Sequence, residues 1–407
     1  MKSYNVYIDS AAWFCEGNIV DASRIYRYMI ENGHKITEDP CKADYIIINS
    51  CGFIQERIDR CEYLYNKFSK QKKENASIII YGCLLKINPE LINSFDSINI
   101  EMEEEEKFDK IFYNKVKFKS INPYCTEEII KKLFYKKDII IQLKYPTFFI
   151  TYIMKRFSNN IRKNFNKIIT NTSHDGKILV EICNGCTSNC NYCLIKKAKG
   201  NVKSRPIKNI IDDISKLYNP SKKLFLVADD CSCYGVDIKT NFFNLVDEIS
   251  KKFPDLLIDI DTLNPEWVQR YPKEYVKIFK DANFNFVTIP VQSGSNKVLK
   301  NMNRRYDINK ILKTIDEIKK VSPKTFIYSH FIIGYPGEGW IDFFKTLKST
   351  IHFDFPIILN YSDHKGSKSY SLTKHNSRAT IKLKENISNI FLMFIVAHKL
   401  RSHPKKL

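Results

Sequence analysis

The segment Cys183-Asn-Gly-Cys186-Thr-Ser-Asn-Cys190-Asn-Tyr-Cys193 holds four of the 12 cysteines in the 407-residue chain. It follows the apolar run Ile178–Ile182, which predicts a strand. Cys186, Cys190 and Cys193 are spaced C-x3-C-x2-C, and soft thiolates at such short spacing can wrap a compact iron–sulfur cluster. The loop falls at the carboxyl end of the strand, where barrel enzymes carry out their chemistry.

A zinc site is the main alternative for these cysteines. Zinc ribbons have two C-x2-C pairs separated by roughly 12 to 20 residues, whereas three residues separate the pairs Cys183/Cys186 and Cys190/Cys193. The single tight loop therefore favours an iron–sulfur cluster. Three cysteines on a four-iron cubane leave one iron with an open position, which a catalytic metal requires. Cys183 is then the remaining thiol, and we expect it to be structural.

From Lys177 onward, strand and helix signals alternate and predict an α/β fold. Six apolar runs predict strands at Ile178–Ile182, Leu224–Val227, Leu257–Ile260, Phe286–Pro290, Thr325–Ile333 and Ile357–Tyr361. Helical stretches separate them at Ile207–Tyr218, Phe242–Lys252, Asn309–Lys320 and Phe343–Ile351. The repeats predict a partial (β/α)6 barrel over residues 177–380. A helix at Ile387–Leu400 and a basic tail complete the chain, over residues 381–407.

Residues 1–98 have βαβ patterning of their own. Strands are expected at Tyr4–Ile8, Tyr45–Asn49 and Ile78–Tyr81, with a helix at Val20–Asn32, so we predict a small parallel sheet of the flavodoxin or Rossmann type. Residues 99–176 have a poorer pattern, in which acidic residues give way to basic and aromatic ones. They are expected to form a linker or insertion; docking of a partner or a membrane surface is the alternative.

The charge and the ends of the chain limit its partners and compartment. The chain has 65 basic and 45 acidic residues, a net charge of +20 and a pI near 9.2. This balance favours contact with RNA or a ribonucleoprotein, although coding bias explains it equally well. No signal peptide opens the sequence and no apolar run approaches the roughly 20 residues of a membrane span. We expect a cytoplasmic protein without membrane contact, where cysteines serve as metal ligands or catalysts more often than as disulfides.

Three further cysteines, Cys15, Cys51 and Cys83, follow or end the predicted N-terminal strands. Open α/β sheets bind ligands outside the carboxyl ends of their strands, so these thiols could together hold a second cluster. The alternative is that each is a small buried apolar side chain.

The residues around both sets resemble the radical S-adenosylmethionine (radical SAM) methylthiotransferases. The resemblance rests on Cys15-Glu-Gly-Asn-Ile-Val-Asp21, Asn49-Ser-Cys-Gly-Phe-Ile54, Tyr81-Gly-Cys-Leu84 and the Cys186–Cys193 triplet. It continues through Lys203–Pro206, Asp230–Asp237, Pro290–Ser295, Leu299–Tyr306 and Phe331–Glu338. The Asn49–Ile54 stretch is most similar to the branch that modifies an aspartate of a small-ribosomal-subunit protein. The tRNA-modifying branch is the next most similar.

The resemblance implies two 4Fe-4S clusters and SAM as cofactors. Cys186, Cys190 and Cys193 would hold the cluster that binds SAM and, with an electron from a flavodoxin- or ferredoxin-type donor, yields a 5′-deoxyadenosyl radical. Cys15, Cys51 and Cys83 would hold the cluster that carries or relays sulfur. SAM would serve twice, once to methylate sulfur and once to make the radical. That radical would abstract hydrogen from an unactivated carbon, and the resulting substrate radical would capture the methylthio group.

Other family residues carry over to the SAM or substrate pocket. Tyr192, Gln292, Ser293 and Arg304 are candidate contacts. Gly334 to Glu338 resembles the turn that lines the adenosine, where Gly334 lets the backbone approach and Glu338 accepts a hydrogen bond. The alternatives are that Tyr192 belongs to the core, that Arg304 lies on the surface and that Gly334 to Glu338 form an ordinary tight turn.

The sequence departs from the family in three places. Asp229 stands where glutamine is common, and His330 stands where an acidic residue is frequent. Family members usually end in a small β-barrel, the TRAM domain, yet no alternating β pattern follows Leu383. We expect a divergent enzyme that modifies a protein or peptide, for example a ribosomal protein. The alternatives are a tRNA methylthiotransferase, another radical SAM peptide-modifying enzyme and a zinc-bearing nucleic-acid-binding protein.

Overall fold

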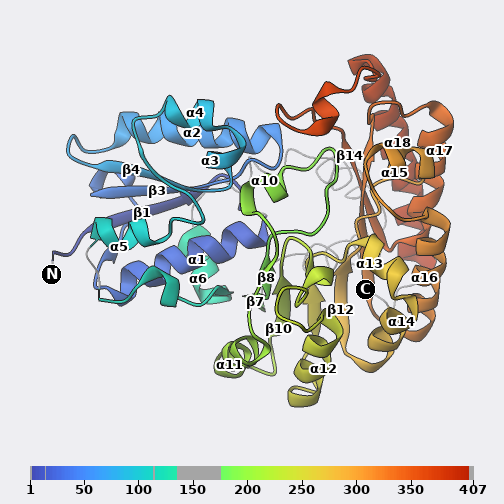
Figure 1. Cartoon of the computed structure of the whole chain (residues 1–407), viewed down its shortest axis with the longest axis horizontal. Helices are drawn as coiled ribbons and strands as arrows, with labels where there is room; N and C mark the ends of the chain where they lie inside the picture. The colour runs from blue at the N-terminus through green and yellow to red at the C-terminus, as the bar shows by residue number, and fades with distance from the viewer. Residues whose placement is uncertain (1, 14, 113–114, 135–175, 403–407) are drawn as a thin grey trace.

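The computed structural model describes residues 2–13, 15–112, 115–134 and 176–402 (Figure 1). The first part of the chain forms a five-stranded sheet in which every neighbouring pair is parallel. Its order is β2-β1-β3-β4-β5, with β1 at Asn5–Ser10, β2 at Lys35–Ile36, β3 at Tyr45–Ser50, β4 at Ser77–Gly82 and β5 at Ile98–Ile100. This is the strand order of flavodoxin-like sheets, so the prediction for the N-terminal sheet is confirmed.

Helices cover both faces of this sheet, because its buried strands are apolar on both sides. Ile47 lies in the core shared with α1 (Glu16–Glu31), whereas Ile46 and Ile48 pack toward α2 (Gln55–Gln71). Neighbouring residues of a strand point to opposite faces, so a continuous isoleucine run is what a doubly covered strand needs.

The second sheet has seven strands in the order β14-β13-β12-β11-β10-β7-β6. Six are parallel: β7 (Lys177–Glu181), β10 (Lys223–Val227), β11 (Ile258–Ile260), β12 (Phe284–Thr288), β13 (Phe326–Ile333) and β14 (Phe355–Asn360). The short β6 (Tyr124–Thr126) runs antiparallel to β7 at the edge. No described strand joins β14 to β6, so the barrel is open and the predicted partial (β/α)6 fold is confirmed.

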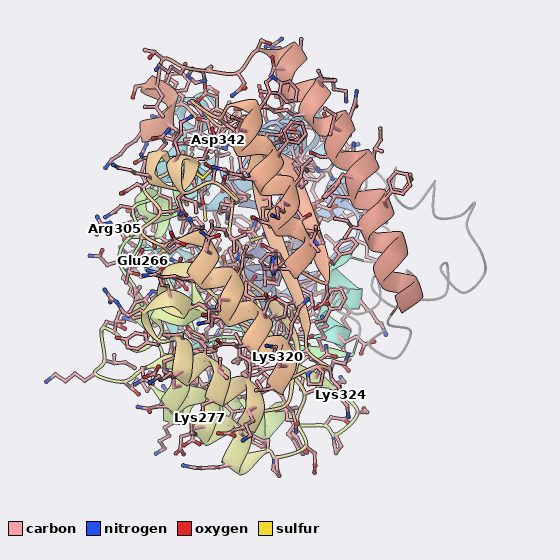
Figure 2. All side chains as sticks on the ribbon, turned by 90° about the vertical axis from the view of Figure 1, so that its right-hand side faces the viewer. Glu266, Lys277, Arg305, Lys320, Lys324 and Asp342 are labelled. Carbon is pink, nitrogen blue, oxygen red and sulfur yellow. The ribbon has the colours of Figure 1, made fainter. Side chains whose placement is uncertain are left out.

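Helices pack on the outer face of the open barrel (Figure 1). They are α11 (Ile207–Leu217), α12 (Phe242–Lys252), α14 (Pro272–Asp281), α16 (Ile308–Val321), α17 (Trp340–Ser349) and α18 (Arg378–Ser402). Lys277 on α14 and Lys320 on α16 extend into solvent on this surface (Figure 2). The final helix begins nine residues before the predicted Ile387. None of the described helices is long and apolar enough to cross a membrane.

The inner face of the barrel sheet shares one hydrophobic core with α1 and the N-terminal sheet. Leu179 and Phe225 lie in this core together with Ile25 and Tyr28 of α1. The alternate residues of the same strands, such as Ile178 and Leu224, pack on the outer helices. The two sheets are therefore joined by apolar burial.

Described residues after position 99 contribute to the same core. Phe108 and Phe112 of α5 (Glu106–Phe112) and Phe118 are almost fully buried there, and β6 extends the barrel sheet. The acidic residues of this stretch form ion pairs within the chain, with Arg24–Glu105 at 2.6 Å and Lys86–Glu103 at 2.7 Å. Partner docking is the alternative to a linker for the basic and aromatic residues of this stretch, and four of them, Phe148, Phe149, Lys155 and Arg156, lie outside the described residues.

A buried ion pair crosses the inner face of the barrel sheet. Lys177 Nζ lies 2.9 Å from Asp259 Oδ2, and the two side chains are 1% and 0% exposed. The ammonium also lies 5.0 Å from the centre of the Phe225 ring, and Asn285 donates to the other carboxylate oxygen of Asp259 at 2.6 Å. Removal of one partner would leave an uncompensated charge in an apolar setting.

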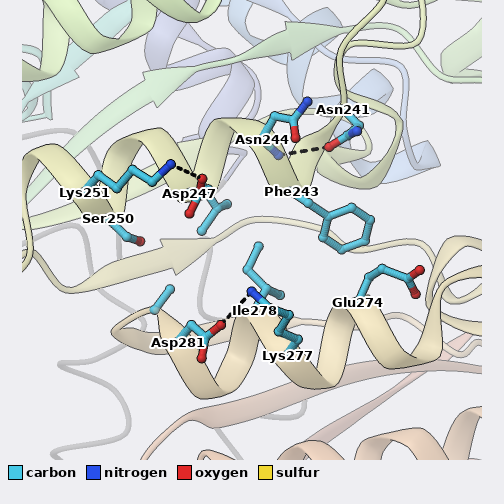
Figure 3. A pocket seen from close by; sticks show the side chains of 12 residues that line it. Asn241, Phe243, Asn244, Asp247, Ser250, Lys251, Glu274, Lys277, Ile278 and Asp281 are labelled. Carbon is cyan, nitrogen blue, oxygen red and sulfur yellow. Dashed lines mark hydrogen bonds and ion pairs between the residues drawn. The ribbon is translucent and has the colours of Figure 1, made fainter.

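We therefore predict that Lys177→Met lowers the free energy of unfolding by about 3 kcal/mol in denaturant melts. The double variant Lys177→Met/Asp259→Leu should recover much of that loss, because no lone charge remains. Lys277→Met, which breaks the exposed pair with Asp281 (Figure 3), is the matched control and should change little. If Lys177→Met were as stable as the parent, the buried pair would have no role in stability.

Candidate active site with two adjoining cysteine sets

The central set, Cys186, Cys190 and Cys193, lies on a loop with a fixed base. The loop leaves β8 (Cys183–Asn184), which pairs antiparallel with β9 (Lys203–Ser204). Gly185 opens it at φ 84°, and a Cβ there would lie 2.4 Å from the carbonyl oxygen of Asn201. Only glycine fits such a turn without displacing the backbone. The short helix α10 (Ile195–Lys199) ends the loop.

The three thiols of the central set are free and partly exposed. Backbone N–H groups point at two of the sulfurs, from Ser188 to Cys186 Sγ at 3.4 Å and from Ile195 to Cys193 Sγ at 3.5 Å. Burial raises the pKa of Cys193 to about 12, with the neighbouring Cys190 adding to the shift. The amide hydrogen bond of Ile195 opposes this shift without cancelling it, so the free loop holds Cys193 as a thiol and cluster binding must release its proton.

Cys183 lies apart from these three. Its side chain is 1% exposed, and its thiol donates to the carbonyl oxygen of Asp230 at 3.7 Å. Burial and the side chain of Cys233 raise the pKa of Cys183, with the hydrogen bond to Cys233 as the largest cause. The surroundings of Cys183 are those of a packed thiol.

The N-terminal set, Cys15, Cys51 and Cys83, lies at the carboxyl ends of adjacent parallel strands. Cys51 directly follows β3, Cys83 directly follows β4, and Cys15 follows β1 as the residue before α1. Cys51 interacts electrostatically with both Cys15 and Cys83. Burial is the main reason that the pKa of Cys51 and that of Cys83 are raised, to about 12 for Cys83. The fold therefore brings together residues that are far apart in the sequence.

The two cysteine sets adjoin. Cys83 packs against a small apolar cluster of Ile87, Leu194 and Ala198, and Leu194 is the residue after Cys193. Helix α10 contacts α3 (Leu84–Ile87), which follows Cys83. Figure 1 shows α10 at the junction between the N-terminal sheet and the barrel.

The donor chemistry of both sets fits iron–sulfur clusters. In the described part of the chain, no three His, Cys, Asp or Glu side chains are placed to hold a single metal ion. Neither set therefore has the compact geometry of a zinc site. Each set offers three soft thiols on loops at strand ends, and a cubane takes its thiolates at separate corners.

Arg304 is held beside the central loop by a polar network. Its Nη1 donates to Asn264 Oδ1 at 3.0 Å, and Asn264 donates in turn to Ser188 Oγ at 2.8 Å and Asp230 Oδ2 at 3.2 Å. Burial lowers the pKa of Arg304, but Cys190 and Tyr192 outweigh it and the net shift is upward. The Nε of Arg304 is buried without a hydrogen-bond partner among the described residues, so a donor remains for a bound anion.

Asn264 is a site residue that the sequence analysis missed. It precedes Pro265 at the start of α13 (Pro265–Arg270) and caps that helix through the N–H of Glu266. An Asn-Pro pair after the β11 strand was the available signal. Its contact with Ser188 could not be read from sequence, because 76 positions separate the two residues.

Gln292 and Ser293 form a strained turn after β12. Gln292 has φ 64°, which is uncommon for a residue other than glycine and often marks a functional site. Its backbone bonds to β13 on both sides, with Gln292 N–H to His330 O at 2.9 Å and Ile332 N–H to Gln292 O at 2.7 Å. The Ser293 hydroxyl lies 3.2 Å from that of Thr346, so it holds the turn to α17.

Glu338 closes its own turn with one carboxylate oxygen. Oε2 accepts from Gly334 N–H at 2.7 Å and from Lys384 Nζ at 2.7 Å, and both charged side chains are almost fully buried. Oε1 has no partner among the described residues. Gly334 has φ 79°, and a Cβ there would lie 2.8 Å from Ile381 on α18. The predicted contact turn is therefore tied to the C-terminal helix, with one oxygen left for a ligand.

Tyr192 extends between the cysteine loop and this turn. Its ring lies 6.4 Å from that of Tyr335 in an edge-to-face arrangement. Burial raises the pKa of Tyr192 well above its ordinary value. The ring can therefore line an apolar wall next to Cys193.

The fold and the cysteine loop define a radical SAM enzyme. Residues 180–350 match the family described as the radical SAM superfamily, and residues 7–101 match uncharacterized protein family UPF0004. The chain is similar to a solved structure of the cobalamin-dependent S-adenosylmethionine radical enzyme OxsB, with a TM-score of 0.51 and 13% identity. That match covers 99% of this chain and 56% of the OxsB chain, and it shows the fold.

Two curated relatives narrow the class. The chain is 30% identical to the ribosomal protein uS12 methylthiotransferase RimO of Clostridium kluyveri, over 88% of this chain and 75% of that protein. It is 25% identical to a probable threonylcarbamoyladenosine tRNA methylthiotransferase of Methanocaldococcus jannaschii, over 92% and 79%. The chain belongs to the radical SAM methylthiotransferase family. Enzymes of this family use SAM and two 4Fe-4S clusters to transfer methylthio groups.

We predict that Cys186→Ala abolishes deoxyadenosine formation from SAM and halves the iron of the anaerobically reconstituted protein, because the central set loses a ligand. Cys41→Ala is the matched control, since Cys41 is exposed and belongs to neither set. Iron analysis and chromatography of the SAM products give both readouts. Unchanged SAM cleavage in Cys186→Ala would contradict the assignment of the central set.

His330 gives a pH-dependent contribution to stability. It lies on β13 next to Tyr328, and burial lowers its pKa to about 4 although Glu16 opposes the shift. The unfolded chain binds a proton near pH 6.5, so stability falls as the pH drops from about 6.5 to about 4. The loss from this group is about 3 kcal/mol.

We therefore predict that His330→Asn flattens the pH dependence of unfolding between pH 6.5 and 4 relative to the parent. Denaturant melts of the reduced protein at several pH values measure the difference. Parallel stability curves for the two proteins would show that His330 is not held neutral by the fold.

Proposed function

We propose that the protein inserts a methylthio group at an unactivated carbon of a protein or peptide substrate, with an aspartate of a ribosomal protein as the model. Cys186, Cys190 and Cys193 hold the SAM-binding cluster, and Cys15, Cys51 and Cys83 hold the second cluster. The observation that carries the proposal is the packing of Cys83 against Leu194 and Ala198, because sulfur transfer needs both sets at one place.

The clusters supply radical generation and sulfur delivery when bound, and the chain supplies binding and orientation. Arg304 offers its free Nε–H to the carboxylate of SAM, and Asn264 fixes the guanidinium at 3.0 Å. Glu338 holds the adenosine turn through the N–H of Gly334 and can accept a hydrogen bond at Oε1. Tyr192, which packs edge-to-face against Tyr335, and Gln292 are further contacts to SAM or substrate in this proposal. A flavodoxin- or ferredoxin-type protein supplies the electrons.

A protein substrate is supported by the Asn49–Ile54 stretch and by the 30% identity to a ribosomal-protein enzyme. A tRNA substrate is the second candidate, and the net charge of +20 together with the archaeal tRNA-modifying relative favours it. The two candidates share every cofactor, so only the product distinguishes them.

We predict that the reconstituted, reduced enzyme with SAM and sulfide adds one methylthio group to ribosomal protein uS12 and none to bulk tRNA. Mass spectrometry of the digested protein and of the tRNA nucleosides measures both products. Cys51→Ala is the matched control, because it should still cleave SAM but form no methylthiolated product. A methylthiolated nucleoside with unmodified uS12 would overturn the protein assignment and support tRNA.

A further inference from the structure

A lysine that follows the central loop lies near Cys15, and its charge acts on all three cysteines of the N-terminal set. Lys199 ends α10, and its side chain is 9% exposed. Its Nζ lies 3.0 Å from Asp229 Oδ1, and the other oxygen of Asp229 accepts from Gly185 N–H at 2.9 Å. The Asp229 carboxylate therefore holds both ends of the central loop, Gly185 at its start and Lys199 at its close.

The ammonium of Lys199 extends from this anchor to the N-terminal set. A Cβ built on Gly17 would lie 3.5 Å from Lys199 Nζ and 3.9 Å from Cys15 Sγ, so both atoms adjoin the same point. The positive charge of Lys199 also acts on Cys51 and Cys83, where it opposes the effect of burial. Gly17 has no side chain to separate the ammonium from Cys15.

The surroundings of Lys199 fix its charge. Burial lowers the pKa of Lys199, but Asp229 just after β10, Cys83, Asp21 of α1 and Glu181 of β7 outweigh it, and the net result is a pKa well above the ordinary lysine value. The ammonium therefore stays charged next to the N-terminal set. A nearby positive charge favours the more negative state of a thiolate-bound cluster, and charge is one of the factors that set cluster potentials.

We propose that Lys199 is a positioning residue for the group bound by the N-terminal set: anchored by Asp229, its ammonium stabilises the reduced form of that group and raises its reduction potential. This inference rests on the proposed function, because it requires a cluster on Cys15, Cys51 and Cys83.

The test isolates the N-terminal cluster in the full chain. The variant Cys186→Ala/Cys190→Ala/Cys193→Ala, reconstituted anaerobically with iron and sulfide, keeps only the N-terminal set and is the parent. Lys199→Met in this parent should shift the reduction potential to more negative values in a redox titration followed by electron paramagnetic resonance. Lys199→Arg should keep the parent potential, because it restores the charge.

Lys197→Met is the matched control, since Lys197 is exposed on the same helix. The double variant Lys199→Met/Asp229→Asn controls for misfolding of Lys199→Met, because it leaves no unpaired Asp229 carboxylate. Its potential should still lie below that of the parent, since Lys199 acts on Cys83 more strongly than Asp229 does.

The outcomes separate the two proposals. A parent that binds no iron would overturn the second cluster and with it the proposed function. A parent with about four irons whose potential is the same in Lys199→Met and in the double variant would overturn the role of Lys199 alone. A negative shift of similar size in Lys197→Met would also overturn it, because the effect would then not depend on the contact.

Discussion

The shared hydrophobic core between the two sheets is the interaction on which the site depends. Helix α1 buries Ile25 and Tyr28 in the core that also contains Leu179 and Phe225 on the inner face of the barrel sheet. This packing fixes the direction of α1, whose first turn begins next to Cys15. The charge of Glu16 consequently acts on His330 and Asp261 of the barrel, so the start of α1 lies against the barrel strands. Without this core the two cysteine sets would be on independent domains.

Charged groups also shape the site, through the pKa values of the thiols and through two buried ion pairs. Burial raises the pKa of Cys51, Cys83, Cys186 and Cys193, and backbone amide or lysine donors oppose that effect. Cluster formation must therefore release their protons. The charged partners are placed in pairs: Lys199 with Asp229, and Lys384 with Glu338, each with little exposure. A buried pair fixes geometry more than it adds stability, and here the pairs tie loops of the site to separate elements.

The sequence predicted the parts of the fold that periodicity controls. The run Ile46–Ile48 and the barrel strands fell within a few residues of their observed positions, because burial on both faces requires continuous apolar residues. The two-residue β2 and the three-residue β6 were missed, since so few residues carry no periodic signal. The aromatic residues Phe108, Phe112 and Phe118 looked like part of a surface linker, but only the tertiary fold shows them buried.

The site, like the fold, could be predicted only where local sequence carries the signal. Spacing and strand ends were sufficient to group the cysteines, but the contacts of Asn264, Lys199 and Lys384 join residues far apart in the chain, and no local pattern reports such pairs.

Each of the two adjoining cysteine sets is proposed to bind a cubane. The most direct measurement is the iron and sulfide content of the anaerobically reconstituted wild-type chain, with Mössbauer spectra to identify the clusters. We expect about eight irons and about eight sulfides per chain, all in 4Fe-4S form. About four irons, or zinc in place of iron, would contradict it.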